Sequence, residues 1–145
     1  MIDGLNNAGA LPVLERLMQF AGRRHEVIAN NIANLNTPDF QPTDVSVEGF
    51  QAQLREAVEA RRDVGGKGNG GLELEDTEEI SVSGSRMELH PQPMGEGILQ
   101  HDGNDRNVEK IMQDMVENFM AFRAAAQFMR FQTGLINSAI AERVS

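Results

Sequence analysis

The chain lacks the residues on which several kinds of protein chemistry depend. It has no cysteine, tryptophan or tyrosine among its 145 residues. The absence of cysteine excludes disulfides and thiolate chemistry, and it fits either an oxidising or a reducing compartment. Basic residues are scarce as well, 13 against 22 acidic ones, which gives a net charge of −9. Because no basic patch offsets phosphate repulsion, the charge argues against nucleic acid as the main partner.

Long hydrophobic runs are missing too. No run approaches the roughly 20 apolar residues that a membrane-spanning helix needs. The first residues, MIDGLNNAGALPVL, lack the basic start and the apolar core of a cleavable secretory signal. A protein with this N-terminus that functions outside the cell would therefore need another export route.

No pattern of side chains indicates a catalytic, metal or cofactor site. His90 and His101 have no acid or nucleophile at a recognisable spacing, and the acidic stretch Leu72–Ile80 gives no defined ligand loop for a cation. The glycine-rich segment Gly65–Gly71 lacks the flanking strand and the Lys-Ser/Thr pair of a phosphate-binding loop. We therefore predict a protein that is not an enzyme and has no cofactor and no small-molecule substrate.

The sequence does have a long apolar seam near its N-terminus. Alternating steps of three and four residues, typical of a helix that packs lengthwise against another helix, connect Leu11, Leu14, Met18, Ala21, His25, Ile28, Ile32 and Leu35. We interpret His25 as a packed or partner-bonded seam residue rather than a metal ligand. Because Pro38 disfavours helical geometry at Thr37, we expect the helix to end near Asn36.

A second seam lies near the C-terminus, on a helix expected from about Asn107 to about Arg143. Its residues are Val108, Met112, Met115, Phe119, Phe122, Ala126, Met129, Thr133, Ile136 and Ile140. A further apolar stripe lies beside it and contains Ala121, Ala125, Phe128, Leu135 and Ala139. This surface is wider than a two-helix seam can cover, so it is either a bundle core or a surface awaiting partner subunits.

The residues between the two seams carry most of the charge. Residues 41–107 have a net charge of −8, whereas residues 1–40 have −1 and residues 108–145 have zero. A short helix capped by Ser46 and carrying Phe50 and Leu54 on one face either folds back on the first helix or stays loose until assembly. After the glycine-rich linker, Leu72–Ile80 is a possible strand, and the prolines and glycines that follow indicate loops or short edge strands.

Asparagines crowd the last two turns of the first helix. Asparagine is a poor residue for a helix interior because its amide competes for nearby backbone groups. The cluster is either a ragged helix end with asparagine caps or an amide-rich face that bonds to a neighbouring chain. Asn30 and Asn34 lie on one helix face, four residues apart, and we predict that they act mainly between chains.

The segment Ala29–Phe40, ANNIANLNTPDF, resembles the ANNIANANTPGY-type signature of bacterial flagellar rod, hook and hook-associated axial proteins. Its Thr37-Pro38 pair and the short chain are most similar to the proximal members of the flagellar basal body rod protein family. The chain departs from the signature at three positions, with Leu35 for alanine, Asp39 for glycine and Phe40 for tyrosine. The Asp-Gly-Asn turn that precedes the last helix is also common in this family.

The resemblance implies a structural subunit that self-assembles through its terminal helices into the axial drive-shaft of the basal body. It implies partners among further copies, other rod proteins, and membrane-ring or export-gate components at the rod base. It also implies type III export from the cytoplasm without a cleaved signal peptide. The assembly motif that it assigns comprises Asn30, Asn31, Ile32, Asn34, Asn36, Thr37, Pro38 and Phe40. The alternative is a soluble helical adaptor or export chaperone of the flagellar secretion system, which would not need the Asn-rich motif.

We predict a mainly α fold in which the long N- and C-terminal helices pair as an antiparallel coiled coil around an irregular, flexible middle. Residues 1–45 hold the N-terminal helix and the Asn-rich motif, residues 46–104 the acidic middle, and residues 105–145 the C-terminal helix. The side chains expected to carry the helix packing are Leu14, Met18, Ile28, Leu35, Met112, Met115, Phe119, Phe122, Met129, Ile136 and Ile140.

Overall fold

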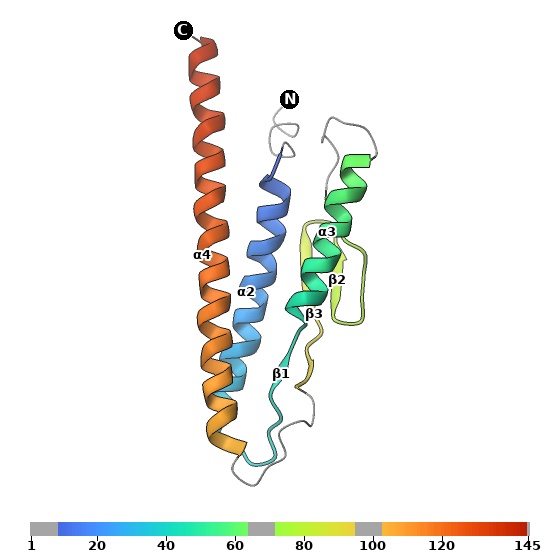
Figure 1. Ribbon diagram of the computed structural model, residues 1–145, viewed down its shortest axis with the longest axis vertical. Coiled ribbons are helices and arrows are strands. Elements are labelled where there is room, and N and C mark those ends of the chain that lie inside the picture. The colour runs from blue at the N-terminus through green and yellow to red at the C-terminus, as the bar shows by residue number, and fades with distance from the viewer. Residues whose placement is uncertain (1–8, 64–71, 95–102, 145) are drawn as a thin grey trace.

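The computed structural model describes residues 9–63, 72–94 and 103–144. Its elements are α2 (Leu11–Asn34), β1 (Thr43–Asp44), α3 (Val47–Asp63), β2 (Ile80–Ser83), β3 (Arg86–Leu89), β4 (Gln92–Pro93) and α4 (Gly103–Val144). Helix α2 lies between α4 on one side and α3 with the strands on the other (Figure 1). The prediction of a mainly α fold with long terminal helices in contact is confirmed. The segment expected to be a glycine-rich linker lies outside the described residues.

Helix α2 begins and ends as its sequence predicts, within two residues. Pro12 lies in the first turn, where its missing N–H has no helical partner to lose. The helix ends at Asn34, and a tight turn follows, in which the N–H of Phe40 donates to the carbonyl of Thr37 at 3.2 Å. Asp39 has a φ of 60° in this turn. This left-handed conformation explains why the resembling signature has glycine at the position.

Helix α3 confirms the expected cap. The N–H of Gly49 donates to Oγ of Ser46 at 2.9 Å, and the N–H of Phe50 donates to the carbonyl of Ser46. The helix folds back beside α2 rather than staying loose (Figure 1). Phe20 of α2 and Phe50 of α3 stack with ring centroids 4.0 Å apart. An aromatic pair of this kind adds about 0.5–1.5 kcal/mol to the stabilisation from burial.

Two small antiparallel sheets complete the described chain. Strands β2 and β3 form a hairpin in which Ile80 pairs with Leu89 and Ser83 with Arg86. Gly84, with a φ of 60°, makes the two-residue turn between them. Strand β1 pairs with β4, which holds the chain after α2 against the chain after the hairpin. The sequence makes a strand possible over Leu72–Ile80, but β2 begins only at Ile80, the last residue of that range.

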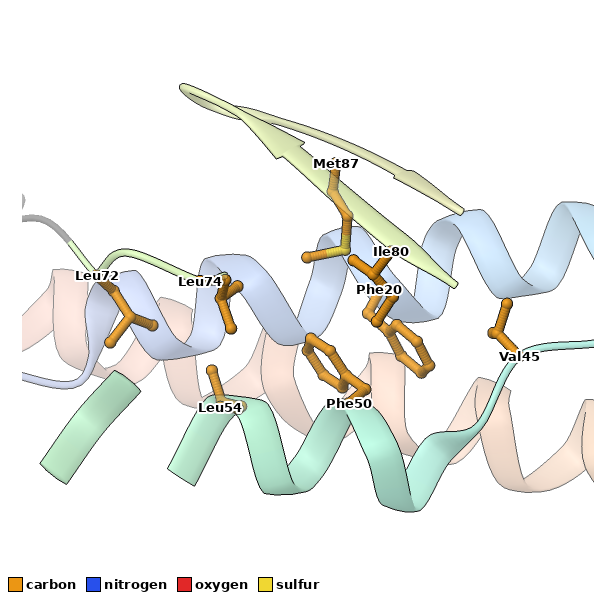
Figure 2. Packing of buried hydrophobic residues seen from close by; sticks show 8 residues of the cluster. All are labelled: Phe20, Val45, Phe50, Leu54, Leu72, Leu74, Ile80 and Met87. Atoms are coloured by element: carbon orange, nitrogen blue, oxygen red, sulfur yellow. The ribbon is translucent and has the colours of Figure 1, made fainter. Parts of the chain in front are cut away.

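The hydrophobic core draws most of its side chains from the middle of the chain. Figure 2 shows its buried residues, which are Phe20, Val45, Phe50, Leu54, Leu72, Leu74, Ile80 and Met87. Only Phe20 belongs to a terminal helix. The expectation of an irregular, flexible middle is therefore not confirmed for residues 46–63 and 72–94. Alternation explains the difference, because Leu72 and Leu74 turn inward while Glu73 and Glu75 stay in water.

Helices α2 and α4 lie side by side and run in opposite directions (Figure 1). The buried side chains of α2 include Leu14, Ala21 and Ile28, which are seven residues apart. Helix α4 has 42 residues against 24 in α2, so it continues well past the beginning of its partner. None of the described helices combines the length and the apolar character needed to span a bilayer.

Candidate assembly surface

The face of α4 that meets α2 is less apolar than the sequence predicts. Its buried residues are Ile111, Asn118 and Ala125, again seven apart. The side-chain amide of Asn118 donates to the carbonyl of Ala21 at 2.8 Å. Met115, Met129 and Ile136, which the sequence assigns to the seam, are partly buried. The contact between the two helices is therefore a mixed one, with a hydrogen bond at its middle layer.

Every large hydrophobic side chain that is exposed in the described part of the chain belongs to α4. Four of these residues form an outer patch, defined as Met112, Val116, Phe119 and Met120. Three more, nearer the C-terminus and spaced for one helix face, form a distal patch, defined as Phe128, Phe131 and Leu135. Phe122 and Ile140 are exposed as well. Neighbouring exposed apolar side chains of this kind are a common feature of interaction sites.

The residues expected on the two seams are therefore divided between the buried contact of α2 with α4 and the exposed surface. Leu14 and Ile28 are buried, and Met18 and Leu35 are partly buried. Met112, Phe119, Phe122 and Ile140, in contrast, are exposed. His25, expected to lie on the seam of the first helix, is also exposed. The cause is geometric, since an apolar position at heptad spacing on α4 can lie on the face toward α2 or on the face turned away from it.

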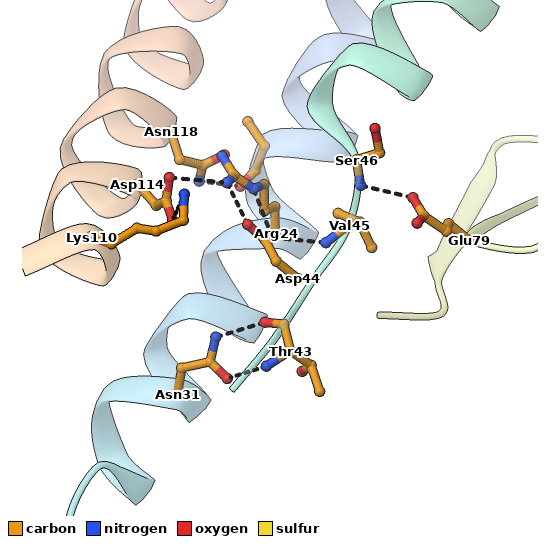
Figure 3. A network of polar contacts seen from close by, with 11 residues as sticks. Arg24, Asn31, Thr43, Asp44, Val45, Ser46, Glu79, Lys110, Asp114 and Asn118 are labelled. Atoms are coloured by element: carbon orange, nitrogen blue, oxygen red, sulfur yellow. Dashed lines mark hydrogen bonds and ion pairs between the residues drawn. The ribbon is translucent and has the colours of Figure 1, made fainter. Parts of the chain in front are cut away.

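Asn31 uses its amide within the chain. Its side-chain nitrogen donates to the carbonyl of Thr43 at 2.7 Å, and its oxygen accepts from the N–H of Thr43 at 3.1 Å. The side chain is almost fully buried, at 1% exposure. Figure 3 shows this two-point contact between α2 and β1. Asn31 thus closes the turn after α2 by bonding to the backbone as a neighbouring strand would.

The other asparagines of the motif lie nearer the solvent. The amide of Asn34 donates to the backbone carbonyl of Asn30 at 2.9 Å and to its side-chain oxygen at 3.0 Å. Asn30 is exposed, and so are the three residues Asn36, Thr37 and Pro38. Ile32 and Phe40 are partly buried. The assembly motif thus contains one residue that serves the fold and a polar edge that faces away from it.

Sequence reasoning missed a buried charge between α2 and α4. Arg24, 6% exposed, donates through Nε to Oδ1 of Asp44 at 2.9 Å and through Nη2 to Oδ2 at 2.6 Å. The same Nη2 lies 3.6 Å from Oδ1 of Asp114 (Figure 3). The signal that could have found it is spacing, because Arg24 follows Ala21 by three residues and precedes Ile28 by four, which puts it on the buried face.

Burial alone lowers the pKa of Arg24, but its hydrogen bond to Asp44 and the charges of Asp44, Asp114 and Glu117 outweigh that effect and raise the pKa above its ordinary value. The guanidinium of Arg24 therefore stays charged throughout the pH range in which the protein is folded. We call Arg24, Asp44, Asp114 and Asn118 the polar cluster. In the described residues no three His, Asp or Glu side chains gather in a way that could hold a metal ion.

An elongated pair of helices with apolar patches on the longer one is typical of helical proteins that pack on other proteins through an exposed helix face. A family model described as "Flagella basal body rod protein" matches residues 15–41, which include most of α2 and the Asn-rich motif. The chain is similar to flagellar basal body rod proteins in this segment.

Curated relatives match along most of the chain. A protein named flagellar basal body rod protein FlgB from Proteus mirabilis (strain HI4320) is 28% identical over 91% of this chain and 92% of its own length. A protein of the same name from Bacillus subtilis (strain 168) is 25% identical over 84% of this chain and 85% of its own length. One from Yersinia ruckeri is 37% identical over 47% of this chain and 45% of its own length. No solved structure gives a significant match.

Proposed function

We propose that this chain is a structural subunit of the bacterial flagellar basal body rod. The observation that carries the proposal is the concentration of exposed apolar side chains on α4, in a chain whose relatives are named as rod proteins. The function needs no catalytic residue, because its chemistry is the removal of this apolar surface from water when subunits meet. The place of action is then the rod itself.

The energetics favour a polymer over a single pairwise contact. Full burial of one large apolar side chain is worth about 1.5–3 kcal/mol, whereas association costs at least about 4 kcal/mol of lost translation and rotation. One patch of three or four side chains leaves only a modest surplus. Two patches at different levels of α4 allow each subunit to contact more than one neighbour, so that the contacts reinforce one another along the rod.

The pairing of α2 with α4 supports a finer proposal, an antiparallel coiled coil that forms the axial part of the subunit. The seven-residue spacing of Leu14, Ala21 and Ile28 on α2 matches that of Ile111, Asn118 and Ala125 on α4. We propose that the outer and distal patches then pack on corresponding helices of further copies and of other rod proteins. Membrane-ring or export-gate components are the partners proposed for the rod base.

The exposed edge of the Asn-rich motif supports a further part of the proposal. Asn30 and Asn34 bond to each other along α2 and face away from the core. Uncharged amides both donate and accept, so they can match several different groups on neighbouring subunits. We propose that these two residues act mainly between chains, whereas Asn31 acts within the chain.

The experiment is incorporation into basal bodies in cells from which the native gene has been removed. The test variant, Phe128→Asp/Phe131→Asp, puts two charges into the distal patch, and the control, Gln51→Asp/Ala60→Asp, puts two charges on exposed positions of α3. We expect the test variant to fold normally when isolated but to be absent from purified basal bodies, because an unpaired charge is costly in a packed interface. Normal incorporation of the test variant would refute the proposal.

A further inference from the structure

Helix α4 turns a partly polar face toward α2 and a more apolar face toward water. Asp114 and Asn118 lie at the α2 contact, where the side chain of Asp114 is 13% exposed and Asn118 is 4% exposed. The outer patch, from Met112 to Met120, is 46–61% exposed on the same stretch of helix. On apolar character alone the outer patch would be the better partner for α2. Something other than hydrophobicity must therefore select the face.

The two faces are related by a simple rotation of α4 about its own axis. At about 100° per residue, Met112, Val116 and Phe119 point roughly 100–160° away from Asn118. They lie at the same levels along α2 as the buried residues Ile111 and Asn118. A rotation alone would thus exchange one face for the other, without changing the length or the direction of the helix pair.

The polar cluster distinguishes the two arrangements. Arg24 is held by both oxygens of Asp44, and Oδ1 of Asp44 also accepts from the N–H of Val45 at 2.8 Å. Val45 belongs to the hydrophobic core. The guanidinium is therefore fixed by the core and by β1, independently of α4 (Figure 3). It presents an immobile, buried positive charge to whichever face of α4 packs against it.

The two faces of α4 differ in what they place beside that charge. The observed face brings Asp114 to 3.6 Å from Nη2 of Arg24, and Asp114 is held in turn by Lys110 at 3.7 Å. Asn118 adds its hydrogen bond to Ala21 one turn further along. The outer patch offers methionine, valine and phenylalanine, which have no acceptor for the remaining N–H groups of Arg24. Packing that patch on α2 would bury donors without partners.

We propose that the polar cluster selects which face of α4 packs on α2. Asp114 and Asn118 act as specificity-determining residues, comparable to a single buried polar residue that fixes the register of a coiled coil. They add little to the affinity of the two helices, but they keep the apolar outer patch from folding inward. If the chain is a rod subunit as proposed above, the cluster thereby reserves that patch for other subunits.

The absence of native cysteine makes a direct test possible. Single cysteines are placed at Ala125, which is 4% exposed, and separately at Val116, which is 61% exposed. The rate at which each thiol reacts with iodoacetamide reports which face is covered. In the parent chain, with monomer confirmed by sedimentation, we expect Val116→Cys to react at least about tenfold faster than Ala125→Cys, because a buried thiol reacts only on local opening.

The test variant removes the charges and the Asn118 hydrogen bond without adding bulky apolar side chains to the side of α4 that faces α2, as Arg24→Met/Asp44→Asn/Asp114→Asn/Asn118→Ala. We expect its helix content to persist and the ratio of the two rates to fall below about threefold, because both faces then become acceptable to α2. The matched control, Arg23→Met/Glu26→Gln, removes an exposed ion pair from the same helix and should leave the ratio at the parental value. An unchanged ratio in the test variant, or an equal fall in the control, overturns the proposal.

If circular dichroism shows that the fourfold variant does not fold, the single change Asp114→Asn decides. It keeps the size of the side chain but removes the negative charge beside Arg24, so we expect the ratio of rates to fall about twofold or more. No change would overturn the proposal. Because these measurements use the isolated chain, their failure is distinct from failure of the rod assignment, which is read from basal bodies.

Discussion

Two pairs of phenylalanines show how the chain separates folding from assembly. Phe20 and Phe50 are 4% and 1% exposed, stacked on each other within the core. Phe128 and Phe131 are both 62% exposed, on α4. All four lie on helices, so neither residue type nor secondary structure explains the contrast. It arises because α3 and the strands cover one face of α2, whereas no described part of the chain covers the distal patch.

Apolar spacing along a sequence therefore identifies an apolar helix face, but it does not identify what covers that face. Stability should depend on the body of the molecule, which comprises α2, α3 and the strands. Assembly should depend on the patches of α4, which contribute little to the fold of the single chain. Matched substitutions in the two regions test this division.

The largest effect is expected from truncating a phenylalanine in the body. Phe50→Ala should lower the free energy of unfolding by about 3–5 kcal/mol, because it leaves a cavity in the core and removes the stacked ring from Phe20. Phe128→Ala, the matched change in the distal patch, should alter it by less than about 0.5 kcal/mol. Urea denaturation of the two variants makes the comparison. Similar losses in both would show that the distal patch is already part of the folded monomer.

A somewhat smaller loss is expected from Arg24→Met. The change leaves Asp44 and Asp114 buried without their shared partner and should cost about 2–3 kcal/mol, since both carboxylates retain slight access to water. Arg23→Met on the same helix removes only an exposed pair with Glu26 and should have almost no effect. Thermal unfolding at neutral pH distinguishes them. Equal midpoints would mean that the polar cluster does not stabilise the chain.

The asparagines are expected to divide in the same way. Asn31→Ala removes two hydrogen bonds to Thr43 and should lower the free energy of unfolding by about 1–3 kcal/mol. Asn34→Ala should leave the helicity of the free chain unchanged or slightly raised, because alanine has the higher helix propensity. Its expected effect is weaker incorporation into rods. Circular dichroism and basal-body yield are measured together, and a free Asn34→Ala chain that unfolds would contradict the division.

The smallest effect concerns the turn after α2. Asp39 has a left-handed φ of 60°, a conformation that costs glycine nothing. Asp39→Gly should therefore raise the free energy of unfolding by about 0.5 kcal/mol, within reach of careful denaturant titration. Asp39→Val, with a β-branched side chain at the same position, serves as the opposite control and should lower it. A stabilised valine variant would show that the turn is not fixed in this conformation.

The sequence predicts the terminal helices well because long heptad patterns and a proline give strong local signals. It also predicts the Ser46 cap. It does not predict the folded middle, since Leu72, Leu74, Ile80 and Met87 are separated by charged residues and find their partners only through contacts distant in sequence. The spacing of residues within one segment does not predict such contacts.

The candidate surface is predicted only in part. Heptad counting places Met112 and Phe119 on the seam, yet Ile111 and Asn118, one residue earlier in each case, are the buried ones. The sequence carries two overlapping apolar patterns on this helix. Which of them packs on α2 depends on the position of Arg24, which pairs with a carboxylate of α4 only in one arrangement. For the same reason the sequence alone does not divide the asparagines, because the bond of Asn31 to Thr43 depends on the turn that brings β1 back to α2.

The central claim is that the exposed apolar face of α4 becomes buried when rods form. The most direct measurement is the labelling rate of a single cysteine, Phe131→Cys, in the isolated chain and in purified basal bodies that contain it. We expect the thiol to react rapidly in the free chain and at least about tenfold more slowly in the rod, with full reaction after denaturation. Equally rapid labelling in an incorporated chain would contradict the account, because the distal patch would then remain open to water after assembly.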